Sequence, residues 1–251
     1  MNPFPYCFFP TTVIGIGFTD DNHRINKCLN SQSIASYQEF IHEQEALAYL
    51  NKIGQPKIFF RRLASQGSVP LDMSSVNYLY EEIYNPQRYE TVSCLIYKQN
   101  ELDERSWAFL EAVENLPVKK ILLTERKNEK LEMQAFNKGL IDFYICQQDA
   151  NLSVLLGEFI QRSQQAYFQE HVNYCISLLI EGQLSNLDPY ALGDPTFTNF
   201  IQGFIKQERF TETYLLDVSG SFLFLNDKGK ASTLFVFNEE RFIDHCHEVD
   251  Q

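Results

Sequence analysis

The chain has 251 residues, 44% hydrophobic and 14% aromatic, which is enough for a large core in one or two domains. Its formal net charge of -12 argues against a surface for nucleic acid or anionic membranes, because phosphate groups are bound by lysine and arginine. No apolar run is long enough to span a bilayer, and the six cysteines form no C-x-x-C pair, so we expect reduced thiols in a cytoplasmic protein.

The first part of the chain alternates between short apolar runs and amphipathic segments. The predicted strands are residues 12–18, 35–41, 92–97, 120–124 and 143–146. The predicted helices are residues 21–29, 43–53, 106–115, 131–140 and 152–180. This alternation is typical of the α/β class, with a doubly wound, parallel, five-stranded sheet.

Residues 55–90 do not fit this alternation. They separate a predicted helix from the next strand by about 35 residues, whereas connections in such units usually have about 2–6. The segment is rich in tyrosine and aliphatic residues, and residues 76–84 have helical character. We therefore predict an insertion within a first domain that comprises residues 1–163.

Residues 164–251 are predicted to form a linking helix and a small α+β domain. A helix at 195–206 begins after Asp194, with Pro195 in its first turn. Three short apolar runs follow, separated by tight turns that contain glycine, which indicates an antiparallel meander. The helix at 195–206 is the nearest element that could cover the meander.

Charged and hydroxyl side chains follow several of the predicted strands. Asp20 and Asp21 follow the first strand, Lys98 follows the third, and Thr124 ends the fourth. Paired carboxylates suit Mg²⁺, but an ammonium group beside them would repel the cation, so we expect no metal and no cofactor. Lys98 is then either an internal counter-ion of the aspartates or a solvent-facing loop lysine. The aspartates could also simply cap a helix.

Residues 12 to about 163 resemble the receiver domain of bacterial two-component response regulators. The matching residues are the acidic pair Asp20-Asp21, the hydroxyl of Thr124 and the aromatic Tyr144. In receivers the acidic pair holds Mg²⁺, and an aspartate after the third strand accepts the phosphoryl group. The hydroxyl and a lysine after the fifth strand sense that group, and the aromatic side chain swings inward.

Two of these family positions carry other residues in this chain. The acceptor aspartate aligns with Lys98, and the sensing lysine aligns with Gln147. The resemblance therefore implies a pseudo-receiver, a non-catalytic regulator that acts through contacts with other signalling proteins. Without a phosphoryl group, we expect Tyr144 to be packed rather than to switch. No catalytic motif such as G-x-S-x-G, a P-loop or H-E-x-x-H is present, so we expect no enzyme.

Two alternatives remain open at this point. The chain could be an ordinary phosphorelay regulator with a displaced acceptor, for which Asp103 and Glu101 are the candidates. It could also sense a small ligand through its C-terminal domain, because residues 214–226 are similar to a PAS-like strand pair with a D-x-x-G turn.

The predicted helix at 152–180 would be about 43 Å long at 1.5 Å per residue, longer than a receiver sheet can cover. Its apolar stripe continues past the expected end of a receiver domain, through Tyr167, Phe168, Val172, Ile176 and Leu179. These side chains must be buried against the C-terminal domain or a second subunit. We favour a homodimer.

Overall fold

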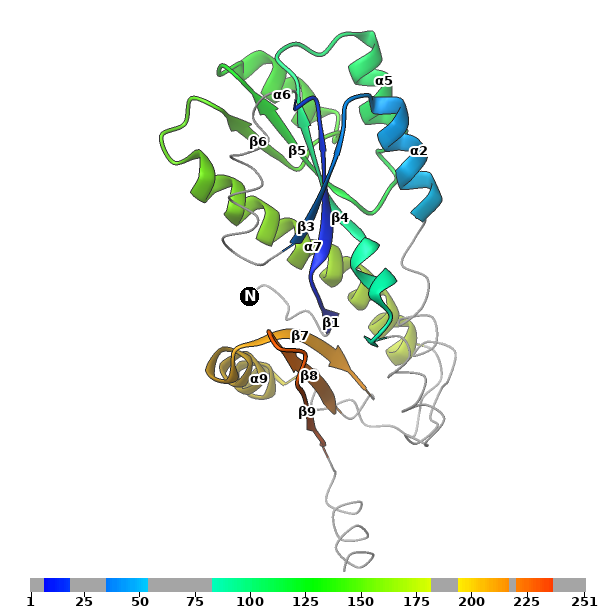
Figure 1. Cartoon of the computed structure of the whole chain (residues 1–251), viewed down its shortest axis with the longest axis vertical. Coiled ribbons are helices and arrows are strands. Elements are labelled where there is room, and N and C mark those ends of the chain that lie inside the picture. Colours follow the sequence, from blue (N-terminus) through cyan, green and yellow to red (C-terminus); the bar gives the residue numbers. More distant parts are fainter. Residues whose placement is uncertain (1–6, 19–34, 54–82, 182–193, 217–219, 237–251) are drawn as a thin grey trace, which may run out of the picture. The chain divides into compact units, whose positions relative to one another are not determined.

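The computed structural model describes residues 7–18, 35–53, 83–181, 194–216 and 220–236, with only the backbone of 171–181 (Figure 1). The chain divides into two compact units. The first contains residues 10–57 and 83–167, and the second contains the chain from Phe168 onward together with Phe9 and the residues before it. The predicted helix at 21–29 and most of the predicted insertion lie outside the described residues. No described helix is long and apolar enough to cross a membrane.

The first unit is built on a parallel five-stranded sheet with strand order β3-β2-β4-β5-β6. Its strands are β2 (Thr11–Ile16), β3 (Ala35–Phe40), β4 (Val92–Lys98), β5 (Lys119–Thr124) and β6 (Phe143–Cys146). The order reverses at β2, as in flavodoxin-like doubly wound folds. The predicted α/β fold is confirmed.

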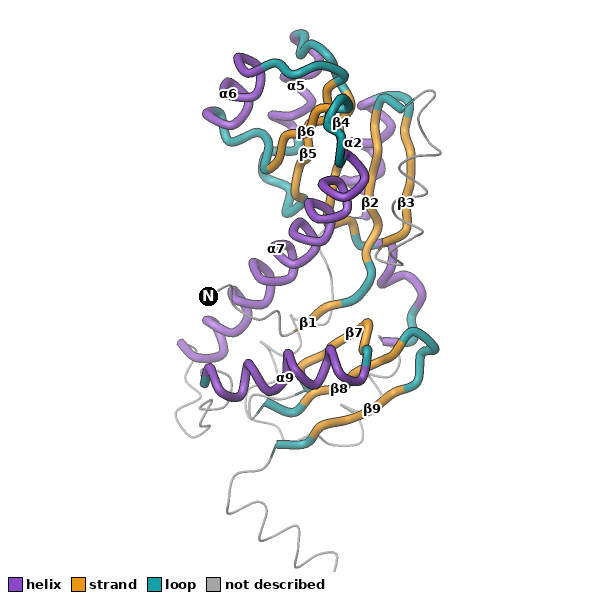
Figure 2. Tube along the Cα trace, turned by 90° about the vertical axis from the view of Figure 1, so that its left-hand side faces the viewer, coloured by secondary structure: helices purple, strands orange, loops and turns teal. Residues whose placement is uncertain are grey.

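Helices cover both faces of this sheet (Figures 1 and 2). One face packs against α2 (Glu43–Ile53), α5 (Glu104–Ala112) and α6 (Glu129–Asn137). The other packs against the first part of α7 (Leu152–Glu181). Successive strand residues enter opposite cores: Leu95 lies in the first and Ile96 in the second. Because both faces of the central strands β2, β4 and β5 are buried, these strands read as nearly continuous apolar runs.

A buried polar contact holds α7 against the sheet. The Gln164 side-chain amide donates a hydrogen bond of 3.0 Å to Oγ1 of Thr11, which lies 2.6 Å from Oγ of Ser93. All three residues are buried. Cys94 on the next position of β4 is also buried, and burial raises the pKa of its thiol to about 12. The hydrogen bonds among Gln164, Thr11 and Ser93 fix the position of α7 along the amino ends of β2 and β4.

The second unit contains an antiparallel four-stranded sheet with order β1-β7-β8-β9. Its elements are α9 (Pro195–Glu208), β1 (Cys7–Phe8), β7 (Phe210–Leu215), β8 (Phe222–Asn226) and β9 (Ala231–Leu234). The predicted α+β domain with its meander is confirmed. Strand β1 was not predicted; it pairs with β7, with Cys7 opposite Tyr214.

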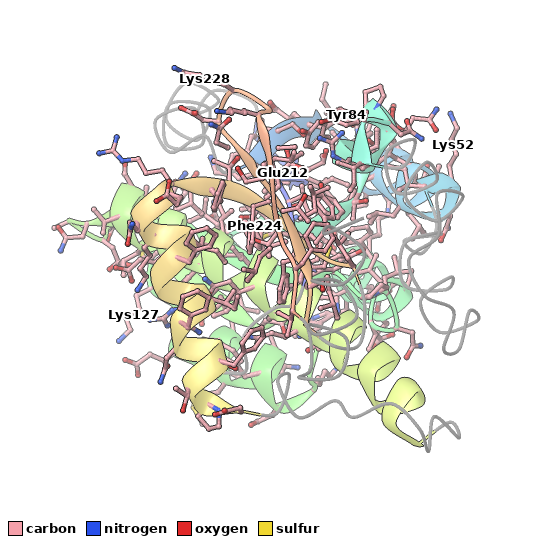
Figure 3. The ribbon with its side chains drawn as sticks, turned by 90° about the horizontal axis from the view of Figure 1, so that it is seen from below. Lys52, Tyr84, Lys127, Glu212, Phe224 and Lys228 are labelled. Atoms are coloured by element: carbon pink, nitrogen blue, oxygen red, sulfur yellow. The ribbon has the colours of Figure 1, made fainter. Side chains whose placement is uncertain are left out.

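The two faces of the second sheet differ in chemistry. On one face Ile201 and Phe204 of α9 pack against Leu215, Phe222 and Phe224. Figure 3 labels Phe224 in β8. Neighbouring side chains of an antiparallel strand alternate, so Glu212 and Tyr214 point to the other face. Glu212 is buried and accepts a hydrogen bond from the Tyr214 hydroxyl. Burial, together with the nearby Glu212, raises the pKa of the Cys7 thiol.

Gly17, which follows β2, lies very close to the backbone at the end of β4. Gly17 has φ 83°, and a Cβ there would lie 2.5 Å from the carbonyl oxygen of Lys98. Gly139 has φ 70°, but nothing lies within 4 Å of a Cβ there. Alanine at either position lowers the free energy of unfolding by about 1–2 kcal/mol, because a residue with a Cβ disfavours positive φ. We expect Gly17→Ala to lower the free energy of unfolding by roughly a further 1–3 kcal/mol.

Urea unfolding of both variants measures this difference. If Gly17→Ala and Gly139→Ala lower the free energy of unfolding equally, the close approach of Gly17 to Lys98 is contradicted.

Candidate functional site

The carboxyl edge of the parallel sheet brings together most of the site residues that the sequence predicted. Lys98 is the last residue of β4, Thr124 the last of β5, and Gln147 follows β6. Two backbone hydrogen bonds join these ends: Gln99 N–H to Leu123 O at 3.0 Å, and Gln147 N–H to Thr124 O at 2.8 Å. Asp20 and Asp21 lie outside the described residues. Ligands of α/β proteins commonly bind at this edge.

Lys98 packs beside the aromatic ring that follows β2. Its Nζ lies 6.0 Å from the centroid of the Phe18 ring, at the limit of a cation–π contact. Phe18 is buried and Lys98 is half-buried. Because Asp20 and Asp21 lie outside the described residues, the expected salt bridge between one of them and Lys98 stays a prediction.

The hydroxyl of Thr124 is held in a network with Tyr144. Thr124 is fully buried; its Oγ1 donates to Arg126 O at 2.8 Å and lies 2.8 Å from the Tyr144 hydroxyl. When the threonine proton goes to Arg126 O, the Tyr144 hydroxyl can donate to Thr124, and Arg126 O lies 3.4 Å from that hydroxyl as a second acceptor. The tyrosine oxygen in turn accepts the backbone N–H of Asn128 at 2.9 Å. Each hydroxyl thus uses its proton within the β5–α6 loop.

This network fixes the position of Tyr144. Its ring packs against the core under α2, α5 and α6, and its hydroxyl reaches the loop before α6. Asn128 also caps α6, since its side chain accepts the N–H of Leu131 at 3.1 Å. No sequence pattern indicated the Arg126 and Asn128 contacts, because both use backbone atoms, which every residue type carries.

Asp103, the candidate displaced acceptor, caps α5. Its Oδ1 accepts hydrogen bonds from both the backbone N–H and the hydroxyl of Ser106, each at 2.8 Å. These bonds lower the pKa of Asp103 below its ordinary value. Glu101, the other candidate, is exposed two residues before this cap.

A second polar contact at this edge was missed by the sequence analysis. The hydroxyl of Tyr97 donates to Oε1 of Glu43, at the start of α2, over 2.9 Å. Tyr97 is buried, and burial raises the pKa of its hydroxyl well above the usual range. The pair ties α2 to the end of β4. An apolar run that includes one tyrosine does not indicate which partner its hydroxyl will find.

Metal ligands do not gather in the part of the chain that the structure describes: no three His, Cys, Asp or Glu side chains come together there. Of the interface candidates, Tyr167 and Phe168 are buried within the single chain. The Phe168 ring lies 4.8 Å from that of Phe9, in the same unit. The side chains of Val172, Ile176 and Leu179 lie outside the described residues.

No family model matches the chain, and no curated protein matches it. Among solved structures, the Legionella pneumophila response regulator LqsR is 29% identical with a TM-score of 0.69, covering 96% of this chain and 70% of that one.

Two further solved structures are less similar. A pilus assembly-related protein from Burkholderia pseudomallei is 7% identical, covering 63% of this chain and 91% of its own, with a TM-score of 0.41. The activated DrrB receiver domain is 11% identical, covering 62% and 97%, with a TM-score of 0.37. The similarity to LqsR extends over both units, and the sheet order is the flavodoxin-like one. The chain therefore carries a receiver-type domain of the response-regulator kind, followed by a further C-terminal domain.

Proposed function

We propose that the chain is a non-catalytic signalling regulator whose receiver-type domain works without being phosphorylated. The observation that carries this proposal is Lys98 at the carboxyl end of β4, the third strand in chain order of the parallel sheet. By the family resemblance this is the position of the acceptor aspartate. A lysine ammonium has donors but no acceptor lone pair, and its charge opposes a bound Mg²⁺.

The hydrogen bonds of the Thr124 hydroxyl support the same proposal. In receivers the corresponding hydroxyl turns to an incoming phosphoryl group. Here its proton is donated to Arg126 O and its oxygen accepts from Tyr144. Turning it would break hydrogen bonds whose net contribution is about 0.5–1.5 kcal/mol each. The hydroxyl would have to give up these hydrogen bonds before it could contact a phosphoryl group.

The displaced-acceptor alternative has less support. The Oδ1 atom of Asp103 already accepts two hydrogen bonds as the cap of α5, so a phosphoryl group there would compete with the helix terminus. We infer that the domain signals through the surface it presents to other proteins.

Treatment with a small phosphodonor tests the proposal directly. Incubation with acetyl phosphate and Mg²⁺ should leave the intact mass of the chain unchanged, because Lys98 offers no carboxylate. A receiver domain that retains its aspartate, treated in parallel, must gain a phosphoryl group. The Lys98→Asp variant is the matched comparison, since a mass gain in that variant alone would locate the block at the end of β4.

A hydroxylamine-labile phosphoryl adduct on the wild-type chain would overturn the proposal. Repeating the reaction with Asp103→Asn and Glu101→Gln would then show which carboxylate accepted the group.

The loop network gives an independent prediction. Tyr144→Phe removes the oxygen that accepts the Asn128 N–H. A net hydrogen-bond contribution of about 1 kcal/mol corresponds to amide exchange at Asn128 about fivefold faster. Thr124→Val, which leaves the bond between Tyr144 and Asn128 possible, should change that exchange less. Amide exchange followed by NMR makes the measurement, and equal rates in wild type and Tyr144→Phe would contradict the network.

We also propose that the chain forms a homodimer through the later part of α7. Tyr167 and Phe168 are buried within one chain, so the seam would use Val172, Ile176 and Leu179. Val172→Glu combined with Ile176→Lys should convert the dimer to a monomer by placing charges in an apolar seam. Val154→Glu, at an exposed position of the same helix, should not. Light scattering measures the mass, and a monomeric unmodified chain at high micromolar concentration would contradict the dimer.

A further inference from the structure

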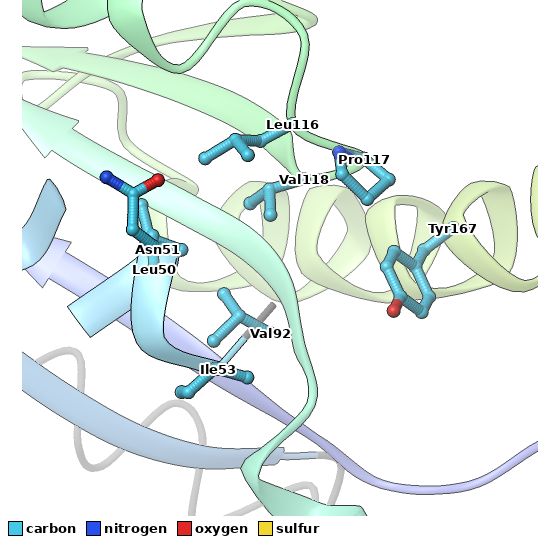
Figure 4. A pocket seen from close by; sticks show the side chains of 8 residues that line it. All are labelled: Leu50, Asn51, Ile53, Val92, Leu116, Pro117, Val118 and Tyr167. Carbon is cyan, nitrogen blue, oxygen red and sulfur yellow. The ribbon is translucent and has the colours of Figure 1, made fainter. Parts of the chain in front are cut away.

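The first unit contains an apolar hollow at the edge of the sheet opposite Lys98 and Thr124. Its volume is about 140 Å³. It lies at the amino ends of β4 and β5 and at the end of α2, and Tyr167 of α7 closes another side (Figure 4). The lining residues are Leu50, Asn51, Ile53, Val92, Leu116, Pro117, Val118 and Tyr167.

The lining restricts what the hollow can hold. Among the described residues that line it, Asn51 and Tyr167 carry the only polar side chains, and none is charged. A charged ligand would lose its hydration there without gaining an ionic partner, which is strongly unfavourable. Leu50, Val92 and Val118 are buried, whereas Asn51 is exposed, so the hollow opens to solvent beside Asn51.

The size of the hollow also points to a ligand. Side chains that line an unfilled hollow lack packing contacts, which a ligand of fitting shape would supply. An engineered apolar cavity of about 150 Å³ stays dry and binds benzene. A hollow of this size and lining therefore matches a compact apolar molecule better than it matches ordered water.

We propose that this hollow binds a small neutral apolar molecule, about the size of one six-membered ring, with any polar group directed to Asn51. Such a ligand contacts α2, the start of β4 and α7 together. Tyr167 is the last residue of the first unit, and α7 continues from it into the second. The ligand would thus act on the helix that joins the two units, at the edge remote from the position of Lys98.

The test uses benzene as the probe and the full chain. In protein with labelled Ile, Leu and Val methyl groups, benzene should cause saturable NMR shifts at Leu50, Ile53, Val92, Leu116 and Val118. Val118→Phe fills the hollow and should weaken the apparent affinity at least about tenfold, because the volume for the probe is lost. Leu116→Phe, at a partly buried loop position, provides a second filled variant should Val118→Phe unfold. Val154→Phe, exposed on α7 and absent from the lining, is the matched control and should bind benzene as the wild type does.

Two results would overturn the proposal. One is a set of shifts that do not saturate or that spread over methyl groups away from the hollow. The other is unchanged benzene affinity in a folded filled variant. The readout does not depend on whether Lys98 prevents phosphorylation, so it separates this proposal from the proposed function.

Discussion

The parallel sheet of the first unit must be covered on both faces, and most of the remaining structure depends on that constraint. Parallel strands are joined by crossover helices, which leave no solvated face. The strand side chains therefore alternate between two apolar cores, with Ile14 in one and Val13 in the other. In the central strands β2, β4 and β5, polar side chains lie towards the strand ends. Lys98 and Thr124 lie at the carboxyl edge, and the apolar hollow lies at the amino edge.

This division would allow a receiver-type domain to keep its fold with a different residue at the end of β4. The stability of the sheet depends on core residues such as Leu95 and Ile96, not on the residue that ends β4. A lysine at position 98 keeps its ammonium near the edge, half-buried beside Phe18. A lysine at this position opens no cavity in either core. The residue that ends β4 can therefore vary without changing the fold.

The sequence predicted the elements with strong periodicity and missed what depends on distant pairing. The five strands and the helices on both faces were recognised because buried strands and amphipathic helices have distinct apolar patterns. Strand β1 has two residues, and its partner β7 lies some two hundred positions along the chain, so no local pattern revealed it. The end-of-strand positions Thr124 and Lys98 were recognisable, but the Tyr144 network was not, because it uses backbone atoms of a loop. For Tyr167 and Phe168, the apolar stripe predicted burial correctly but could not identify the surface that covers them.

The hydrogen bonds around Thr124 and Tyr144 also limit where a ligand or partner could change the conformation of the domain. A ligand or partner shifts a conformational equilibrium only by its difference in affinity between the two states. At the carboxyl edge, a second state would have to replace the hydrogen bonds from Thr124 to Arg126 and from Asn128 to Tyr144. At the amino edge, α7 is held by Gln164 on Thr11 and by apolar packing, and the open hollow beside Tyr167 leaves room for contacts not yet made. An input that adds contacts there need not first break the loop network. The hollow, whose described lining carries no charged side chain, is therefore the place where occupancy can change the packing of α7 at the smaller cost.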